Sequence, residues 1–315
     1  MTVQGQTAAM PAIAEANPRP LLSGRATALV WGLGTALFIA SLVYLGLGIR
    51  RNWAALADLR IEHVSWLAGS IAVYAVSHFS TGAAWPLTLR ALGEPVKMAD
   101  GLKIGFVAQV GKYLPGNVAH YFGRAALAKA RGVTIRSSGL STIIELGCAA
   151  VAASVVGLGV FASGRAHVPM LPALGFPLAA GTVAAGLAVL AVGCWSMLGP
   201  RRLLLLAAAC GSITLSLALS GTSAYALLQA MGAAAPWPLV AGSFGLAWII
   251  GFVIPGAPAG FGVREVIFVT LLSPAVGSEV ALACAILHRL VTAGVDLAVA
   301  LWGYFWFGAA ARSNT

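Results

Sequence analysis

The sequence predicts an all-α, polytopic integral membrane protein. Of its 315 residues, 59% are hydrophobic and only 9% are charged, and the mean hydropathy is +0.90. A soluble domain with so few charged residues could not cover that much apolar surface. In addition, Pro-Gly pairs break the apolar segments at two places. We therefore expect about six full spans together with two re-entrant helical hairpins.

The expected elements follow from the length of each apolar run. Residues 1–26 are rich in Ala, Pro and Gly and are predicted to be a mobile N-terminal tail, whereas residues 27–310 are predicted to form one transmembrane, transporter-like domain. A helix needs about 20 apolar residues to cross a bilayer. The runs of sufficient length are 27–49, 64–85, 138–161, 174–198, 203–231 and 280–307.

The first break follows residues 104–114, a run too short to cross a hydrocarbon core about 30 Å thick at about 1.5 Å per residue. Pro115-Gly116 ends this run, and residues 117–131 return. Proline lacks an amide donor and glycine weakens a helix, so a continuous helix cannot pass through. Irregular backbone persists within a bilayer only where protein or a water-filled cavity covers it. We interpret this segment as a re-entrant hairpin.

The second break has the same design. Residues 237–254 lead into Pro255-Gly256, and residues 266–272 lead away from it. Five of the eleven residues in 255–265 are Pro or Gly, which excludes a continuous helix. The positions expected to break the helices are Pro115, Gly116, Pro255, Gly256, Gly260 and Gly262.

The distribution of Lys and Arg predicts the orientation. With the N-terminus in the cytoplasm, eleven of these residues fall in cytoplasmic segments and four fall outside, as the positive-inside rule requires. We expect both termini on the cytoplasmic side of the inner membrane. Three full spans separate the two breaks, so the hairpins would enter from opposite faces. The halves, roughly 64–161 and 203–308, would then form an inverted repeat, which is typical of alternating-access transporters.

Polar residues near the breaks are candidate ligands for an anionic lipid headgroup. Asn117, His120 and Arg124 are spaced at i, i+3 and i+7, so they share one helical face. They follow a break, where the positive end of a helix favours an anion. Lys112 on the approaching limb and Arg264 after the second break would complete a phosphate site. Alternatively, Lys112 and Arg124 only extend to the headgroup layer, as positive side chains near helix ends do.

Ionisable side chains within the spans are expected to gate or couple transport, because an unpaired charge there is costly. We predict a bridge between the two halves formed by Glu145 and Arg289. The alternative is a local cluster in which Arg264 and Glu265 reach His288. Either arrangement could serve only to fix the register of the helices. The residues with this role would be Glu145, Glu265, His288, Arg289 and Asp296.

The sequence offers little for enzyme chemistry. It contains only three Asp and six Glu, and it has no Walker A, Gly-x-Ser-x-Gly or His-Glu-x-x-His motif. The four cysteines lie in apolar segments without Cys-x-x-Cys spacing, so we expect neither a disulfide nor a metal site. We predict a protein that is not an enzyme and has no cofactor. The net charge of +10 lies mostly in loops beside spans and does not indicate nucleic-acid binding.

Two sets of residues resemble the integral-membrane flippase part of lysylphosphatidylglycerol synthase and its stand-alone relatives. The first set is Gly111-Lys112-Tyr113-Leu114-Pro115-Gly116-Asn117, with Gly123-Arg124 and Glu145. The second is Pro255-Gly256, Gly260 to Glu265 and Leu287-His288-Arg289. The resemblance covers most of 27–310 and implies movement of phospholipids or polyprenyl-phosphate-linked sugars between leaflets. Arg264 departs from the second family motif, which often has no Arg. Without the synthase's aminoacyl-transferase domain, we expect no lysine transfer.

The leading hypothesis is a flippase that moves an anionic phospholipid or polyprenyl-phosphate-linked sugar through a polar cavity formed by the two hairpins. One alternative is a membrane enzyme or enzyme subunit that modifies a lipid headgroup, which would change the mass of the lipid. The other is a scaffold for a glycosyltransferase partner, which would co-purify with the protein.

Overall fold

The computed structural model describes residues 60–113, 119–162, 199–253, 260 and 262–312, together with a few positions between 43 and 53. These residues are helical, with no strand among them. Three of the described helices are long and apolar enough to cross a membrane, namely Ile135–Gly157, Pro200–Ala230 and Ser278–Trp306. The predicted tail, the predicted span 174–198 and most of the span 27–49 lie outside the described residues.

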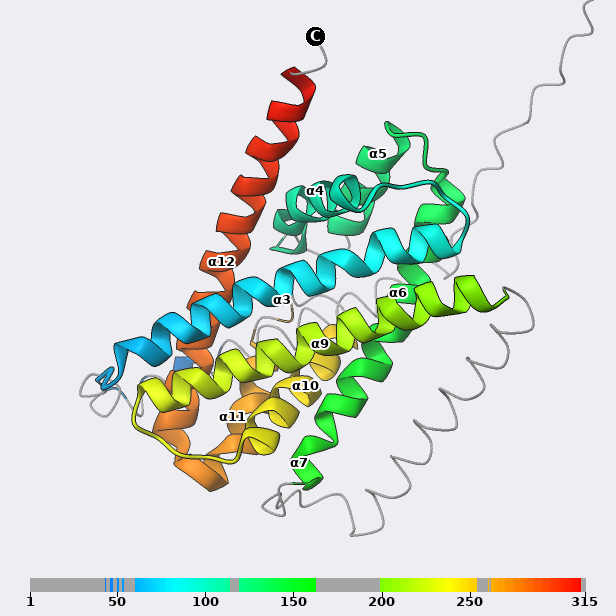
Figure 1. The fold of residues 1–315 in the computed structure, drawn as a ribbon. Coiled ribbons are helices and arrows are strands. Elements are labelled where there is room, and N and C mark those ends of the chain that lie inside the picture. Colours follow the sequence, from blue (N-terminus) through cyan, green and yellow to red (C-terminus); the bar gives the residue numbers. More distant parts are fainter. Residues whose placement is uncertain are drawn as a thin grey trace, which may run out of the picture.

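The helices form two series with the same order (Figure 1). The first consists of α3 (Val64–Ala91), α4 (Met98–Ala108) with the 3-10 turn η1 (Gln109–Tyr113), α5 (Ala119–Lys129), α6 (Ile135–Gly157) and the short α7 (Gly159–Ala162). The second consists of α9 (Pro200–Ala230), α10 (Trp237–Val253), α11 (Val263–Val276) and α12 (Ser278–Arg312). In both series a long helix precedes a pair of shorter helices on either side of a break, and another long helix follows. The break residues Pro115, Gly116, Pro255 and Gly256 lie outside the described residues.

The first long helix of each series ends in the same way. After α3, Gly93 has a φ of 92°, and the amide of Glu94 donates to the carbonyl of Leu89 at 3.0 Å. After α9, Gly232 has a φ of 69°, and the next amide donates to the carbonyl of Leu228 at 3.0 Å. This is a glycine-dependent helix cap, in which a residue with positive φ lets the chain leave the helix while carbonyls remain bonded. The chain therefore turns towards the break segment identically in both series.

Helices α3 and α9 lie side by side and run antiparallel through the centre of the fold (Figure 1). Hydroxyl groups join them along their length. Ser70 Oγ lies 2.8 Å from Ser223 Oγ near one end, and the Ser80 hydroxyl donates to the carbonyl of Ser212 at 2.8 Å near the middle of both helices. Small residues and hydroxyls allow close helix packing where lipid supplies no hydrophobic driving force. Polar side chains, among them these hydroxyls and His78, lower the hydropathy of α3. It is 28 residues long but is not among the three described helices that are apolar enough to cross a membrane.

The two series are interlocked. Helix α4 packs against α12, and α10 packs against α6 and α7. A Cβ added to Gly303 of α12 would lie only 2.7 Å from the Cβ of Phe106 in α4. Gly242 of α10 is in similarly close contact with the backbone amide of Val160 in α7. Each helix that leads into a break therefore rests on the last long helix of the other series.

A disulfide joins Cys148 of α6 to Cys210 of α9, with their Cα atoms 5.1 Å apart. The prediction that no disulfide forms is therefore wrong. The two cysteines are 62 residues apart in sequence, and they meet only because α6 crosses α9 in an alanine-rich contact. That contact contains Ala149, Ala152, Ala153 and Ala209. No local spacing in the sequence could reveal such a pair.

Basic residues gather at one end of the molecule, where α3 ends, α5 ends and α4, α6 and α9 begin. Thr134, just before α6, donates its hydroxyl to the Glu94 carboxylate at 3.0 Å, and hydrogen bonding, chiefly from Ser137, holds the pKa of Glu94 below its usual range. Arg131 pairs with Asp100 at 3.1 Å. The basic residues at this end are Arg90, Lys97, Lys129, Arg131, Arg136, Arg201 and Arg202.

The close contact of α10 with α7 predicts the effect of a single methyl group. We expect Gly242→Ala to lower stability by about 1–3 kcal/mol, because the added Cβ would overlap the backbone of Val160. Thermal unfolding in detergent would measure the change. Gly211→Ala in α9 is the control, since a Cβ there meets no atom within 4 Å. Equal melting temperatures for the two variants would contradict the packing of α10 on α7.

Candidate functional site

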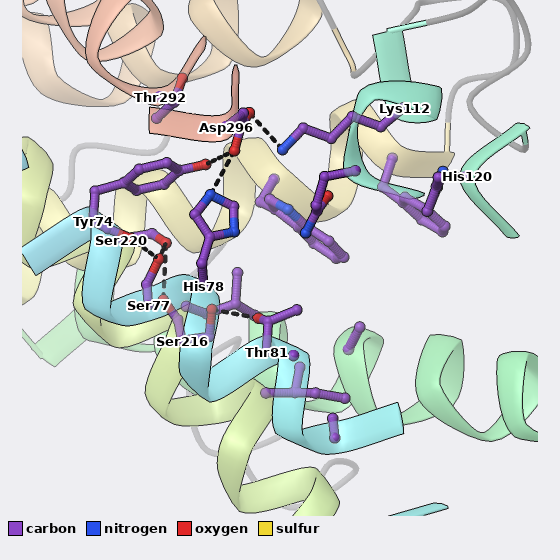
Figure 2. Close-up of a pocket in the computed structure, with 18 of the residues that line it drawn as sticks. Tyr74, Ser77, His78, Thr81, Lys112, His120, Ser216, Ser220, Thr292 and Asp296 are labelled. Atoms are coloured by element: carbon purple, nitrogen blue, oxygen red, sulfur yellow. Dashed lines mark hydrogen bonds and ion pairs between the residues drawn. The ribbon is translucent and has the colours of Figure 1, made fainter. Parts of the chain in front are cut away.

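A cavity of about 270 Å³ lies between the two series, at the level where the break-flanking helices face α3 and α9 (Figure 2). Both series contribute to its wall, although the side chains come from positions far apart in sequence. Of the ten predicted binding and coupling residues, only Asn117 is not among the lining residues, and it lies outside the described residues. The charged residues that line the cavity are Lys112, Arg124, Glu145, Arg264, Glu265, Arg289 and Asp296.

Asp296 of α12 is the centre of one polar cluster. Its carboxylate is only 2% exposed, and Oδ2 lies 2.6 Å from Lys112 Nζ while Oδ1 lies 2.6 Å from His78 Nε2. The Tyr74 hydroxyl donates to Oδ1 at 3.4 Å, and Figure 2 shows these three side chains converging on Asp296. A carboxylate so deeply buried requires such partners. Lys112, predicted to bind a headgroup, is thus also an ion-pair partner, and it links the first series to the second.

Arg124 of α5 pairs with Glu145 of α6. Its Nη2 lies 2.7 Å from Glu145 Oε2 and donates to the Thr142 hydroxyl at 3.3 Å. The guanidinium lies 4.7 Å from the centre of the Trp85 ring, so the cation also faces an aromatic surface. This pair holds the helix that follows the first break against the long helix after it.

Glu265 of α11 pairs with Arg289 of α12. Its Oε1 accepts from Arg289 Nε at 2.7 Å, with Nη2 at 2.5 Å. The other oxygen accepts the amide of Gly262 at 2.6 Å, which caps the start of α11. The predicted Glu145–Arg289 bridge is therefore wrong, because Glu145 pairs with Arg124 and Arg289 pairs with Glu265. The sequence could not show which cation pairs with Glu145, since Arg124 and Arg289 are both distant from it along the chain.

The two ion pairs within the series occupy corresponding places. One joins α5 to α6, and the other joins α11 to α12. In the first the cation lies on the short helix, and in the second the anion does. The sequence alternative, a cluster of Arg264 and Glu265 reaching His288, is also not formed, because Glu265 turns to Arg289.

Arg264 differs from the other cations of the cavity. Among the described residues no carboxylate lies within ion-pair distance of it, and its buried Nε has no hydrogen-bond partner. Its stem packs against Gly251 of α10 and against Gly260, where any added Cβ would overlap it. Its guanidinium lies 5.4 Å from the centre of the Trp248 ring. Gly260 also has a φ of 67°, so the chain requires glycine there for two reasons.

The sequence interpretation missed several residues of the wall. His78 and Tyr74 of α3 are central to the Asp296 cluster, and hydroxyls of α9 continue the polar surface, as in the 2.5 Å contact of Thr81 with Ser216 (Figure 2). His78 could have been found, because an ionisable residue in the middle of an apolar span indicates function. The hydroxyls could not, since serine is common in transmembrane helices that merely pack.

The histidines have aromatic neighbours. The ring of His288 lies edge-on to Phe244 and Tyr74, with centroids 5.2 and 6.0 Å apart. The His120 ring lies 3.7 Å from that of Tyr121, and its Nδ1 has no hydrogen-bond partner among the described residues. Among the residues that the structure describes, no group of three or more His, Cys, Asp or Glu side chains is placed to hold a metal ion.

Comparison with known families gives one match. The family described as the lysylphosphatidylglycerol synthase TM region matches residues 29–300. The chain belongs to this family. The resemblance inferred from the two Pro-Gly motifs is confirmed, and membership indicates a membrane protein with a lipid-related function. No curated protein matches the chain.

The buried pairs of this family member can be tested by comparing single and double substitutions. Arg124→Met leaves Glu145 buried without its cation, so we expect a loss of about 3–5 kcal/mol. In Arg124→Met/Glu145→Leu both charges are gone, and we expect most of the stability to return. Chemical or thermal unfolding in detergent would measure both. A double variant as unstable as the single one would show that the pair does not carry the effect.

Proposed function

We propose that this protein is a lipid flippase, which moves an anionic lipid between the leaflets of the cytoplasmic membrane. One observation carries the proposal: a cavity between the two series holds an excess of positive charge at the level where the helices break. Ionisable groups at membrane depth are costly and generally serve function. The family supports a lipid as the cargo, since its named member acts on a phospholipid.

The arrangement of the helices supports alternating access as the mechanism. The two series have the same order, their first helices run antiparallel, and their hairpin helices pack across onto the other series. Paired broken helices around a central site are typical of inverted-repeat transporters. We infer that α4–α5 and α10–α11 are re-entrant hairpins that enter from opposite faces. The basic end of the molecule would face the cytoplasm, with both termini on that side.

The bridge between the halves would be Lys112–Asp296 rather than the pair predicted from sequence. Lys112 precedes the first break and Asp296 lies on α12, so the pair must separate if one hairpin moves away from the other series. The pairs Arg124–Glu145 and Glu265–Arg289 lie within a series and would move as units. In this mechanism no covalent bond of the lipid is made or broken, so the protein would not be an enzyme.

A substitution that fills the cavity tests the proposal without touching an ion pair. Gly105 lines the cavity, and a Cβ added there meets no atom within 4 Å. We expect Gly105→Trp to reduce leaflet exchange at least roughly tenfold, because the indole would occupy the headgroup space. The assay would follow fluorescent phosphatidylglycerol and a fluorescent polyprenyl-phosphate sugar in liposomes containing the purified protein.

Gly211→Trp is the matched control, because position 211 is exposed and a Cβ added there meets no atom of the described residues within 4 Å. It should exchange lipid at the wild-type rate. Exchange that persists in Gly105→Trp would mean that lipid does not pass through this cavity. If wild-type protein exchanges neither lipid, the flippase proposal fails; a lipid of changed mass would then indicate the headgroup-modifying enzyme, and a co-purifying glycosyltransferase the scaffold.

A further inference from the structure

We propose that the cavity is selective for a headgroup with a single negative charge, and that Arg264 is the residue that binds it. The ligand class is a phosphodiester, whether in a glycerophospholipid or in a polyprenyl-linked sugar phosphate. This inference rests on the proposed function and specifies the substrate of the same site.

The first step is the charge of the wall. Three carboxylates line the cavity, and each pairs with a different cation at 2.5–2.7 Å. Counting the charges of Lys, Arg, Asp and Glu alone, these pairs sum to zero. Arg264 is the remaining charged group among the described lining residues, and no described carboxylate lies within ion-pair distance. The described cavity therefore carries one positive charge in excess.

The second step is the placement of Arg264. Its stem is fixed between Gly251 and Gly260, and its guanidinium lies 5.4 Å from the centre of the Trp248 ring. The side chain is therefore held in the cavity wall, and among the described residues its buried Nε has no acceptor. A guanidinium offers several donors in a planar fork that matches two oxygens of a phosphate. Arg264 is the second residue of α11, so the positive end of the helix dipole lies beside it.

The third step is electrostatic. A net charge carried through a low-dielectric interior is expensive, so the loaded cavity is most stable when its total charge is closest to zero. One bound phosphodiester brings the total charge of the cavity and its ligand to zero. A zwitterionic headgroup leaves the excess positive charge and adds an ammonium group, for which no unpaired carboxylate is available in the described wall. A doubly charged phosphomonoester leaves an excess negative charge.

The volume of the cavity is consistent with binding of the lipid headgroup alone. Pockets for small ligands measure roughly 300–1,000 Å³, and this cavity, at about 270 Å³, lies just below that range. A phosphodiester with a small substituent fits such a space, whereas acyl or polyprenyl chains must remain in the lipid between the helices.

Leaflet exchange of three fluorescent lipids in phosphatidylcholine liposomes tests the selectivity at pH 8. The lipids are phosphatidylglycerol, phosphatidylcholine and phosphatidic acid, whose phosphomonoester carries about two charges at this pH. We expect wild-type protein to exchange phosphatidylglycerol roughly tenfold or more faster than either of the others. A polyprenyl-phosphate hexose, also a phosphodiester, distinguishes the two lipid sources.

Substitutions then assign the selectivity to Arg264. Arg264→Gln should remove the preference for phosphatidylglycerol. Arg264→Lys should retain part of the preference, because lysine carries the positive charge but lacks the planar, bidentate donors of the guanidinium. Arg131→Gln makes the same chemical change at an ion pair outside the cavity and should leave the preference intact. If Arg264→Gln does not fold, Arg264→Lys alone provides the test, because it keeps the charge and loses the planar set of donors. Its preference for phosphatidylglycerol should be weaker than that of the wild type.

The outcomes separate the two proposals. Similar exchange of all three lipids by the wild type would overturn the charge selectivity while leaving the flippase function in place. A preference for phosphatidylglycerol that survives in Arg264→Gln would overturn the role of Arg264. Exchange of none of the lipids, including the polyprenyl-linked one, would overturn the flippase proposal itself.

Discussion

A buried charge in a membrane protein must be matched, and in this structure that constraint determines how the helices are held. Three carboxylates lie in the cavity wall, and each is held by one cation. Two of these pairs fix a short helix to the long helix that follows it. The third, Lys112–Asp296, crosses from one series to the other. Because removing either partner would leave a charge buried alone, the pairs make particular helix arrangements much more stable than others.

The frame around these pairs is built without charge. Helices α3 and α9 pack through serine and threonine hydroxyls, and α10 and α12 approach their neighbours through glycine. Close packing of this kind depends on the exact size of each residue, since no hydrophobic effect draws helices together within lipid. The disulfide between Cys148 and Cys210 adds a covalent link from α6 to α9.

Arg264 connects the fold to the proposed function. Glycine at 251 and 260 leaves room for the Arg264 stem in the cavity wall. Among the described residues, no carboxylate lies close enough to neutralise the guanidinium. A cavity with a fixed, uncompensated cation is suited to an anion that arrives and leaves.

The sequence alone determined the class of protein, and it indicated where long helices end and which charged side chains line the cavity, because each of these has a local cause. Length of an apolar run fixes whether a helix can span, Pro-Gly stops a helix wherever it occurs, and an ionisable residue in an apolar run is conspicuous. Only the tertiary structure decided which charges pair. Glu145 had several possible cations, and it binds Arg124 because α5 packs on α6. The Cys148–Cys210 link and the place of His78 beside Asp296 likewise depend on contacts between helices distant in sequence. Pairing is a property of three-dimensional distance, and no pattern along the chain records it.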